Sequence, residues 1–250
     1  MTQIATDKTN KPAKPTGYVL YEADELVVIA TLESANDKTG DMVQVWILPR
    51  KVNPWTAVKT GMDSIVCLDC MHRGTSYQDR TCYVLVYNAP YSIWEKYNAG
   101  GYEYLPVEEY SEIFSGRKIR LGAYGEPVLI PLGIVEALIA ASAGWTGYTH
   151  QWRKAEYAAY KAYIMASVDR ESEYHLAKAD GWRTFRVRTE EAPILSREIT
   201  CPASDEAGKR TQCERCLLCS GSTAADPRKD ITIIVHGKKK PELFQIAIAA

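Results

Sequence analysis

The fold class is decided by six consecutive segments: KIRLGAYGEP (118–127), IPLGIVEALIAAS (130–142), TGYTHQW (146–152), YIMASVD (163–169), RESEYHLAKAD (170–180) and TFRVR (184–188). Short runs rich in Val, Ile and aromatic residues favour strands, and they alternate with segments of helical periodicity. In the second segment Ile134, Leu138 and Ala141 share one helical face. Strands that alternate with helices predict βαβ units and a parallel sheet.

Further strands and helices flank this core of the sequence. DITIIVHG (230–237) predicts a last strand and CYVLVYNA (82–89) an earlier one, while PYSIWEKYNAG (90–100) and LPVEEYSEIFSG (105–116) predict helices. Counting gives about six parallel strands, which fits an α/β protein built as a partial or complete βα barrel of the TIM-like kind. In such folds the chemistry lies at the carboxyl ends of the strands.

The remaining segments define the domain organisation. Residues 1–16 are polar and predict a disordered arm. GYVLY, ELVVIATLE and MVQVWILP predict an N-terminal β-hairpin or meander over residues 17–60. The barrel-like domain then spans 61–237, with a cysteine cluster at 198–221, and residues 238–250 form a tail.

Composition excludes several classes of protein. The chain has 250 residues, of which 46% are hydrophobic and 24% charged, as in a globular protein. A formal net charge of −1 does not indicate nucleic-acid binding. No apolar run reaches the roughly 18–20 residues of a membrane span, and the N-terminus lacks a signal peptide's apolar core. We therefore expect a cytoplasmic protein with no membrane partner; a protein partner is not specified.

Four of the seven cysteines gather in EITCPASDEAGKRTQCERCLLCSG (198–221), where the last three are spaced C-x2-C-x2-C. The four are Cys201, Cys213, Cys216 and Cys219. Thiolates at this spacing can converge on a tetrahedral zinc ion or on a [4Fe–4S] cluster. The alternative is free thiols packed as small hydrophobic groups. An odd total of seven argues against a closed disulfide framework.

The other three cysteines, Cys67, Cys70 and Cys82, form a second group with the spacing C-x2-C-x11-C. Three thiolates leave one position of a metal centre open, which is typical of catalytic sites. His72 and Arg73 could donate hydrogen bonds that tune a cluster there. A structural zinc site completed by His72 or a fourth cysteine is the alternative.

Polar residues follow the predicted strands and are candidates for binding and catalysis. The candidate ligand-binding turn is Gly122, Gly125, Glu126 and Pro127, because glycines let backbone approach a ligand and a glutamate can accept from an amino group. The alternative is an ordinary βα turn.

Three further strand ends carry candidate catalytic residues. His150 could transfer protons and Asp169 could bind a ribose or amino group. Arg186 and Arg188 share one strand face and could hold a carboxylate or phosphate. We therefore expect Glu126, His150, Asp169 and Arg186 to point into one cavity beside the three cysteines. A solvated strand face is the alternative for the arginines.

A cysteine triplet after one strand and a G-G-E-P-like turn after the next, which reads G-A-Y-G-E-P at 122–127, resemble the radical S-adenosylmethionine (SAM) enzymes over roughly residues 60–237. The resemblance implies that Cys67, Cys70 and Cys82 ligate a [4Fe–4S] cluster whose fourth iron binds SAM. It also implies that Gly125, Glu126 and Pro127 contact the methionyl amino group. The four-cysteine segment resembles an auxiliary cluster. The usual triplet of that superfamily is C-x3-C-x2-C, from which this chain departs.

The whole chain also resembles a family of phage- and plasmid-borne cysteine-cluster proteins in the stretches DMVQVWILPRKVNP, RLGAYGEP, GYTHQWR, MASVD, GWRTFRVR and CPAS. That second resemblance implies no particular reaction. Two other functions fit the same cysteines. One is a non-catalytic zinc protein whose metal sites hold loops together and whose surface binds a partner. The other is an iron–sulfur protein for electron transfer or redox sensing. The three-plus-four division of the thiols favours the enzyme, because a catalytic centre needs an open position.

Overall fold

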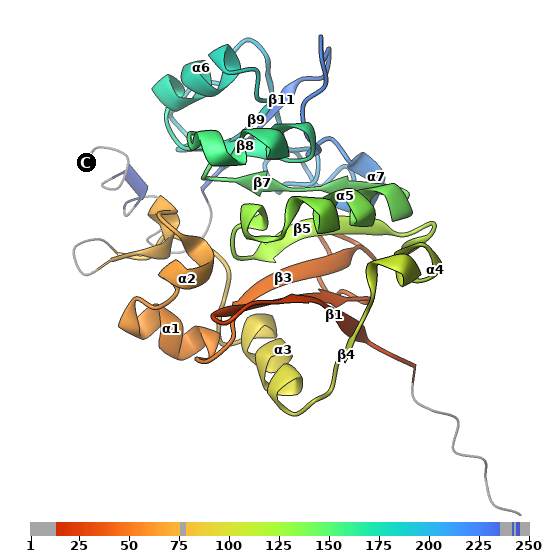
Figure 1. The fold of residues 1–250 in the computed structure, drawn as a ribbon. Coiled ribbons are helices and arrows are strands. Elements are labelled where there is room, and N and C mark those ends of the chain that lie inside the picture. Colours follow the sequence, from red (N-terminus) through yellow and green to blue (C-terminus); the bar gives the residue numbers. More distant parts are fainter. Residues whose placement is uncertain (1–13, 76–78, 236–241, 243, 246–250) are drawn as a thin grey trace, which may run out of the picture.

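The computed structural model describes residues 14–75, 79–235, 242, 244 and 245. Its strands form two sheets, one of six strands and one of five (Figure 1). The strands are β1 (Gly17–Glu22), β2 (Leu26–Thr31), β3 (Val43–Pro49), β4 (Glu103–Tyr104), β5 (Lys118–Tyr124), β6 (Gly144–Thr146), β7 (Tyr148–Thr149), β8 (Met165–Val168), β9 (Thr184–Arg188), β10 (Glu198–Thr200) and β11 (Asp230–Ile234).

Helices connect these strands. The α-helices are α1 (Pro54–Thr60), α2 (Ser64–Cys67), α3 (Ala89–Asn98), α4 (Tyr110–Phe114), α5 (Leu132–Ala141), α6 (Glu171–Ala179) and α7 (Cys213–Cys216), and the 3₁₀ turns are η1 (Met71–Arg73), η2 (Val107–Glu109), η3 (Pro127–Leu129) and η4 (Ala155–Ala162). Local sequence explains the first of them: Asn53 caps α1 by accepting from the Thr56 amide at 2.8 Å, and Gly61 ends it in the left-handed conformation.

The six-stranded sheet is mixed and runs in the order β4-β1-β2-β3-β5-β6. β1, β2 and β3 are antiparallel neighbours, as the predicted N-terminal hairpin requires. However, β3 also pairs with β5 in parallel, Val43 opposite Ile119, and β5 pairs with β6. The hairpin is therefore part of the same sheet as the later strands, and this sheet extends across the predicted boundary at residue 60.

The five-stranded sheet runs in the order β10-β11-β9-β8-β7, and every neighbouring pair is parallel. β6 and β7 follow one another with only Gly147 between them, so one extended stretch contributes a strand to each sheet. A Cβ atom at Gly147 would lie 2.8 Å from Ile164 Cγ2, so glycine permits this close approach. The alternation of parallel strands and helices predicted for residues 118–188 is present.

Two sequence-based assignments need correction. The predicted strand at 82–89 is absent: residues 81–85 have no regular structure and residues 86–88 form a turn. The physical reason is that the segment pairs with no strand of either sheet, and without a partner strand its backbone cannot form ladder hydrogen bonds. Conversely, the short strand β10 was not predicted, because its three residues, Glu198–Thr200, carry too little pattern.

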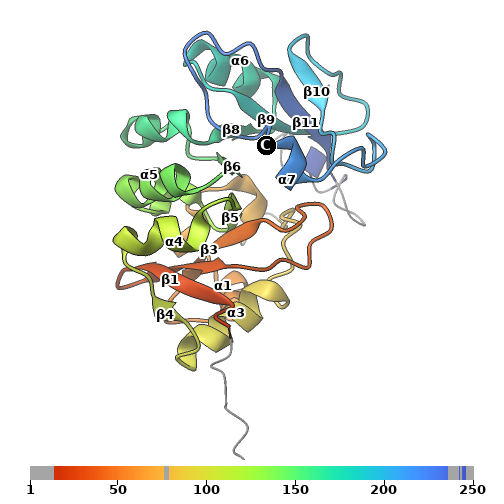
Figure 2. The same cartoon turned by 90° about the vertical axis from the view of Figure 1, so that its right-hand side faces the viewer.

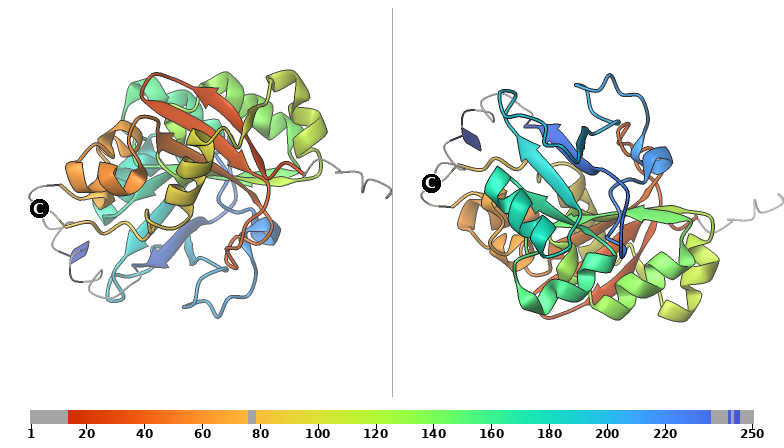
Figure 3. Two further views of the ribbon diagram at one scale, coloured as in Figure 1. Left: turned by 90° about the horizontal axis from the view of Figure 1, so that it is seen from below. Right: turned by 90° about the horizontal axis from the view of Figure 1, so that it is seen from above.

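Helices and cysteine segments lie on different sides of the sheets. α4 and α5 lie on one side, whereas α7 and the loop that carries it lie on the other (Figure 2). The carboxyl ends of β3 and β5 lie toward α1 and α2 (Figure 1). Seen from below and from above, the orange segment with α1 and α2 and the light-blue α7 lie on opposite sides of the molecule (Figure 3). This arrangement brings loops that are distant in sequence around one space.

A buried ion pair stabilises the edge of the five-stranded sheet. Arg186, on β9, donates from Nε and Nη2 to the two carboxylate oxygens of Glu198 at 2.7 and 2.6 Å, and both side chains are almost fully buried. Arg186 Nη2 also donates to the Pro193 carbonyl at 2.7 Å. Removing one partner of such a pair leaves an uncompensated buried charge.

We expect Arg186→Met to lower the free energy of unfolding by about 3–5 kcal/mol, because Glu198 then remains buried without its cation. Chemical denaturation followed by circular dichroism measures this. Lys51→Met is the control, because the Lys51–Glu25 pair is exposed and should change stability by less than about 1 kcal/mol. Equal effects in the two variants would contradict the structural role given to Arg186.

Candidate functional site

A cavity of about 800 Å³ lies at the carboxyl ends of the parallel strands. Its walls come from segments far apart in sequence: the loop after α2, the turn after β5, the ends of β7, β8 and β9, and the loops before α7 and after β11. The predicted site residues among its lining are Cys67, Cys70, Cys82, Gly122, Gly125, Glu126 and His150.

The three-cysteine group is brought together by local backbone bonds. Cys67 ends α2, and the Cys70 amide donates to its carbonyl at 3.0 Å. Cys82 lies beside this loop because its amide donates a hydrogen bond to the His72 carbonyl at 2.9 Å. Burial, and then the neighbouring thiols of Cys70 and Cys82, raise the pKa of the Cys67 thiol well above its ordinary value. None of the seven cysteines forms a disulfide.

The glycine turn is pressed against this group. Gly122 and Gly125 have positive φ angles of 70° and 81°, which glycine adopts readily. A Cβ atom at Gly125 would lie 2.7 Å from both Cβ and the carbonyl oxygen of Ile47. The Glu126 amide donates to the Val66 carbonyl at 2.8 Å, one residue before Cys67. Pro127 is buried and begins η3 without lining the cavity.

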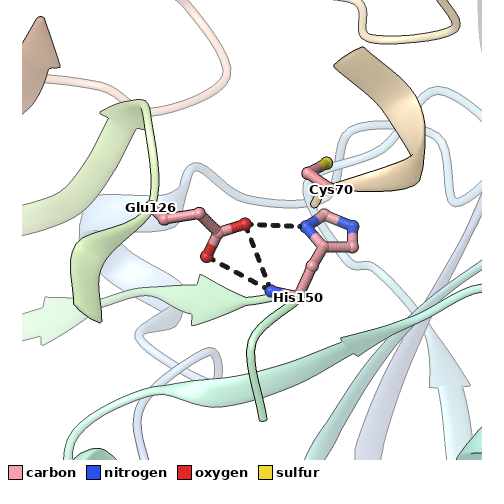
Figure 4. Close-up of side chains that lie close together, drawn as sticks. All are labelled: Cys70, Glu126 and His150. Carbon is pink, nitrogen blue, oxygen red and sulfur yellow. Dashed lines mark hydrogen bonds and ion pairs between the residues drawn. The ribbon is translucent and has the colours of Figure 1, made fainter. Parts of the chain in front are cut away.

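The Glu126 carboxylate is held by the end of β7. It accepts from the Thr149 hydroxyl, from the His150 amide at 3.3 Å and from His150 Nδ1 at 3.1 Å (Figure 4). Cys70 lies beside the same imidazole ring. Burial alone would lower the pKa of His150, but Cys70 and Glu126 outweigh it and raise that pKa well above its ordinary value.

Asp169 and His72 form a second contact behind His150. Asp169 follows β8, and its Oδ1 lies 2.9 Å from His72 Nε2. Burial alone would raise the pKa of the Asp169 carboxyl, but His72 and then His150 outweigh it and hold that pKa below its ordinary value. Asp169 does not line the cavity, whereas His72 does. Phe244, within the predicted tail, is buried and stacks on the His72 ring at 5.7 Å.

Two overlapping sets of side chains are compact enough to hold a metal ion. In each set the ligand atoms lie within 4.8 Å of one another: Cys70, Glu126 and His150 in the first, and His72, His150 and Asp169 in the second. Thiolate, imidazole and carboxylate are all ligands of zinc and of first-row transition metals. His150 belongs to both sets, so a metal ion bound by His150 could be held by either set.

The four-cysteine group lies behind the part of the cavity wall that Gln212 and Arg215 form. Cys201 follows β10, while Cys213 and Cys216 are the two ends of α7. Burial, and then the thiols of Cys201, Cys213 and Cys216, raise the pKa of the Cys219 thiol well above its ordinary value. Arg183 holds the segment to the sheet by donating to the Leu218 and Ser220 carbonyls at 2.7 and 2.8 Å. These four thiols do not line the cavity, although Gln212 and Arg215 do.

The loop between β2 and β3 docks on this segment. The Cys213 and Glu214 amides donate to the Lys38 and Thr39 carbonyls at 2.9 and 3.1 Å, and the Asp41 amide donates to Glu214 Oε2 at 2.7 Å. Gly40 makes this possible, because its φ is 67° and a Cβ atom there would lie 2.5 Å from Glu214 Cδ. The N-terminal hairpin therefore supports the position of α7.

The structure does not bring Arg186 to the cavity. Arg186 is bound by Glu198, and Arg188 Nη1 donates to the Thr189, Glu190 and Ala192 carbonyls. The two arginines share one strand face, as their parity predicts, but that face binds the segment 189–198. Of the four residues expected to point into one cavity, Glu126 and His150 line it, Asp169 lies behind them, and Arg186 lies elsewhere. His236, which follows the predicted last strand at 230–237, falls outside the described residues.

Sequence reasoning missed several residues of the cavity wall, chiefly Arg120, Tyr148, Phe185 and Ser204. Arg120 could have been found from period-two alternation, because it has the parity of Gly122 and Tyr124 on the same strand. The loop around Ser204 gives no such signal, since its approach depends on contacts distant in sequence.

Comparison with known proteins gives no relative. No model of a known protein family matches the chain, and neither a curated protein nor a solved structure matches it. Within the part of the chain that the structure describes, none of the helices has the length and apolar character needed to cross a bilayer.

We expect Gly125→Ala to lower the free energy of unfolding by about 2 kcal/mol or more, because an L side chain at positive φ is strained and its Cβ would overlap Ile47. Gly133→Ala is the matched control: Gly133 is exposed on α5, and nothing lies within 4 Å of its added Cβ. That variant should be as stable as the wild type or slightly more so. Thermal and chemical unfolding measure both, and a tolerated Gly125→Ala would contradict the close packing of the turn.

Proposed function

We propose that the protein is an iron–sulfur enzyme of the radical SAM type. Cys67, Cys70 and Cys82 would hold a [4Fe–4S] cluster with one open iron, and the turn at Gly122–Pro127 would lie beside bound SAM. One observation carries this proposal: the cysteine loop after β3 and the glycine turn after β5 form adjoining walls of one cavity, joined by the Glu126 amide bond to Val66.

The three thiols are of a kind that metal centres use, although their sulfur atoms do not form a set as compact as the two mixed sets around His150. Three thiols from one loop line the cavity, and their burial and mutual proximity make the thiolate form costly without a counter-charge. A metal cation supplies that counter-charge and deprotonates coordinating thiols. Such a cluster, when bound, supplies the single electron that cleaves SAM into methionine and a carbon-centred radical. Three protein ligands leave the open coordination position that this chemistry requires.

The chain's own residues have distinct tasks around this centre. His150 and Thr149 fix the Glu126 carboxylate, so the turn presents its backbone to the cavity in one conformation. Gly122 and Gly125 allow a ligand to approach that backbone closely. The cavity walls limit the access of water, which is needed wherever a radical must react only with its substrate.

The four-cysteine segment supports an auxiliary centre. Cys201, Cys213, Cys216 and Cys219 lie close enough to act on one another's charge, and four thiolates complete the coordination of a zinc ion or a [4Fe–4S] cluster. Its ligands turn away from the cavity while its loop lines it, so this centre would shape the far wall and leave the chemistry to the first. The run of parallel strands supports a partial βα barrel around the cavity.

A second candidate function is a zinc-binding protein without catalysis. The observation that favours it is the compactness of the mixed sets around His150, whose ligand atoms lie within 4.8 Å of one another. Zinc accepts thiolate, imidazole and carboxylate together in tetrahedral sites. The metal present in the native protein distinguishes the two candidates.

We expect anaerobically purified protein to be brown and to contain about eight iron and eight sulfide per chain, as two four-iron clusters require. Cys70→Ser and Cys216→Ser should each remove about half of the iron. His175→Ala, at an exposed site on α6, should leave the content unchanged. Metal analysis and visible absorbance measure this, and a colourless, zinc-loaded protein would support the second candidate.

We expect the protein with intact clusters to bind SAM and, with a strong reductant, to release methionine and 5′-deoxyadenosine. Glu126→Gln should weaken SAM binding about tenfold while iron content stays constant, because the turn loses a charged acceptor that holds its conformation. Glu136→Gln, at an exposed position on α5, is the matched control. Anaerobic equilibrium dialysis and product chromatography provide the readouts. Failure of the iron-loaded wild type to bind SAM would remove the enzyme proposal.

A further inference from the structure

Arg120 lies at the junction of two cavities. The main cavity adjoins a second one of about 540 Å³, and the two share the lining residues Asn36, Tyr83, Val84, Arg120 and Ala123. Arg120 lies in the middle of β5, two residues before Gly122, and is half-buried. A single guanidinium is therefore accessible from both spaces.

This guanidinium has no carboxylate partner among the residues that the structure describes. Its one hydrogen bond there is a long one, from Nη2 to the Tyr148 hydroxyl at 3.4 Å. The groups that act most on its charge are Tyr148, Tyr83 and Cys213, none of which is a carboxylate. A guanidinium removed from water is costly unless an anion or several acceptors meet it. Arg183 and Arg186, by comparison, are held by carbonyls or a carboxylate.

Other charges around the main cavity leave the balance positive. Lys38, Lys209, Arg210 and Arg215 line it together with Arg120; of these, Lys209 is paired with Asp205 and Arg215 with Glu214. Its carboxylates are Asp37, Glu126 and Asp205; Glu126 is bound by His150, and Asp205 by Lys209 at 2.8 Å. An anionic ligand would therefore be attracted into this space, with Arg120 as its innermost cation.

Aromatic rings surround the junction. Tyr148 stacks on Phe185 with ring centroids 4.6 Å apart, and the Tyr83 hydroxyl lies 3.3 Å from the Tyr148 hydroxyl. Trp46 lines the smaller cavity, with its Nε1 donating to Thr31 at 3.0 Å. Flat apolar walls beside one cation suit an organic anion with an unsaturated or aromatic body.

We propose that Arg120 binds the carboxylate or phosphate group of an aromatic organic anion, which occupies the junction between the two cavities. The inference rests on the proposed function in that it names the substrate class for the same cavity. The planar guanidinium can hold either oxyanion through two parallel N–H···O bonds. The ligand's body would lie on the aromatic walls, within the space that the three-cysteine site borders.

Three probes of similar shape test this by anaerobic equilibrium dialysis of the native, metal-loaded protein: 1-naphthoate, 1-naphthyl phosphate and neutral 1-naphthamide. The wild type should bind at least one anion more tightly than the amide, and the tighter of the two identifies carboxylate or phosphate. Arg120→Gln should weaken anion binding by about tenfold or more, the loss expected for a charged hydrogen-bonded contact, while amide binding changes less than about twofold. Arg153→Gln, at a half-exposed site outside both cavities, should change nothing.

Three results would overturn the proposal: no binding of any probe by the wild type, equal binding of amide and anions, or an Arg120→Gln variant that keeps the preference for anions. If Arg120→Gln does not fold, Arg120→Lys decides: an ammonium cannot form two parallel N–H···O bonds, so anion binding should weaken while amide binding stays the same, and unchanged anion binding would overturn the proposal. Iron content is measured on every variant. If an Arg120 variant loses iron but still binds the anions, Arg120 would instead serve to balance the charge of the metal-bound Cys213 thiolate. If the anaerobically purified wild type contains no iron and still binds anions more tightly than the amide, the proposed enzyme would be refuted but the anion site would not.

Discussion

The position of Glu126 is the constraint on which the candidate site depends. Its amide is bound to the Val66 carbonyl, and its buried carboxylate is bound by Thr149 and His150. One residue thereby ties the cysteine loop after β3 and the turn after β5 to the end of β7. Because a buried carboxylate that lost these donors would be costly, the three strand ends are held in a single arrangement. The hydrogen bonds of Glu126 thus hold together the three segments that form this wall of the cavity.

The elements of this fold could be predicted from the sequence wherever a segment has its own periodicity. Residues 118–188 alternate clearly between strand and helix, and the structure contains β5, α5, β8, α6 and β9 there. Residues 82–89 have an equally strong strand composition but form no strand, since a strand also needs a partner strand and this segment pairs with none. The placement of β3 between β2 and β5 likewise depends on contacts between segments distant in sequence, which the local sequence pattern does not predict.

The same limit applies to the candidate site. Spacing in sequence correctly indicated two separate groups of cysteines, because each group lies in one segment. Parity correctly put Arg186 and Arg188 on one face, but it does not say what lies opposite that face. Glu198, twelve positions later, occupies it. Arg120 is the converse case: its parity with Gly122 pointed toward the cavity, while its lack of a carboxylate partner is visible only in three dimensions.

The docking of the β2–β3 loop on α7 has a consequence for the order in which the chain folds. The Asp41 amide and its acceptor Glu214 are separated by 173 positions, so a ribosome releases the hairpin long before its partner exists. Closing such a distant pair is entropically costly and belongs to the late steps of folding. The hairpin turn must stay open until almost the whole sequence has emerged. The assembly of the four-cysteine segment is then the step that fixes the β2–β3 loop in place. A newly made chain that fails at that step would leave the backbone around Gly40 without its partner Glu214.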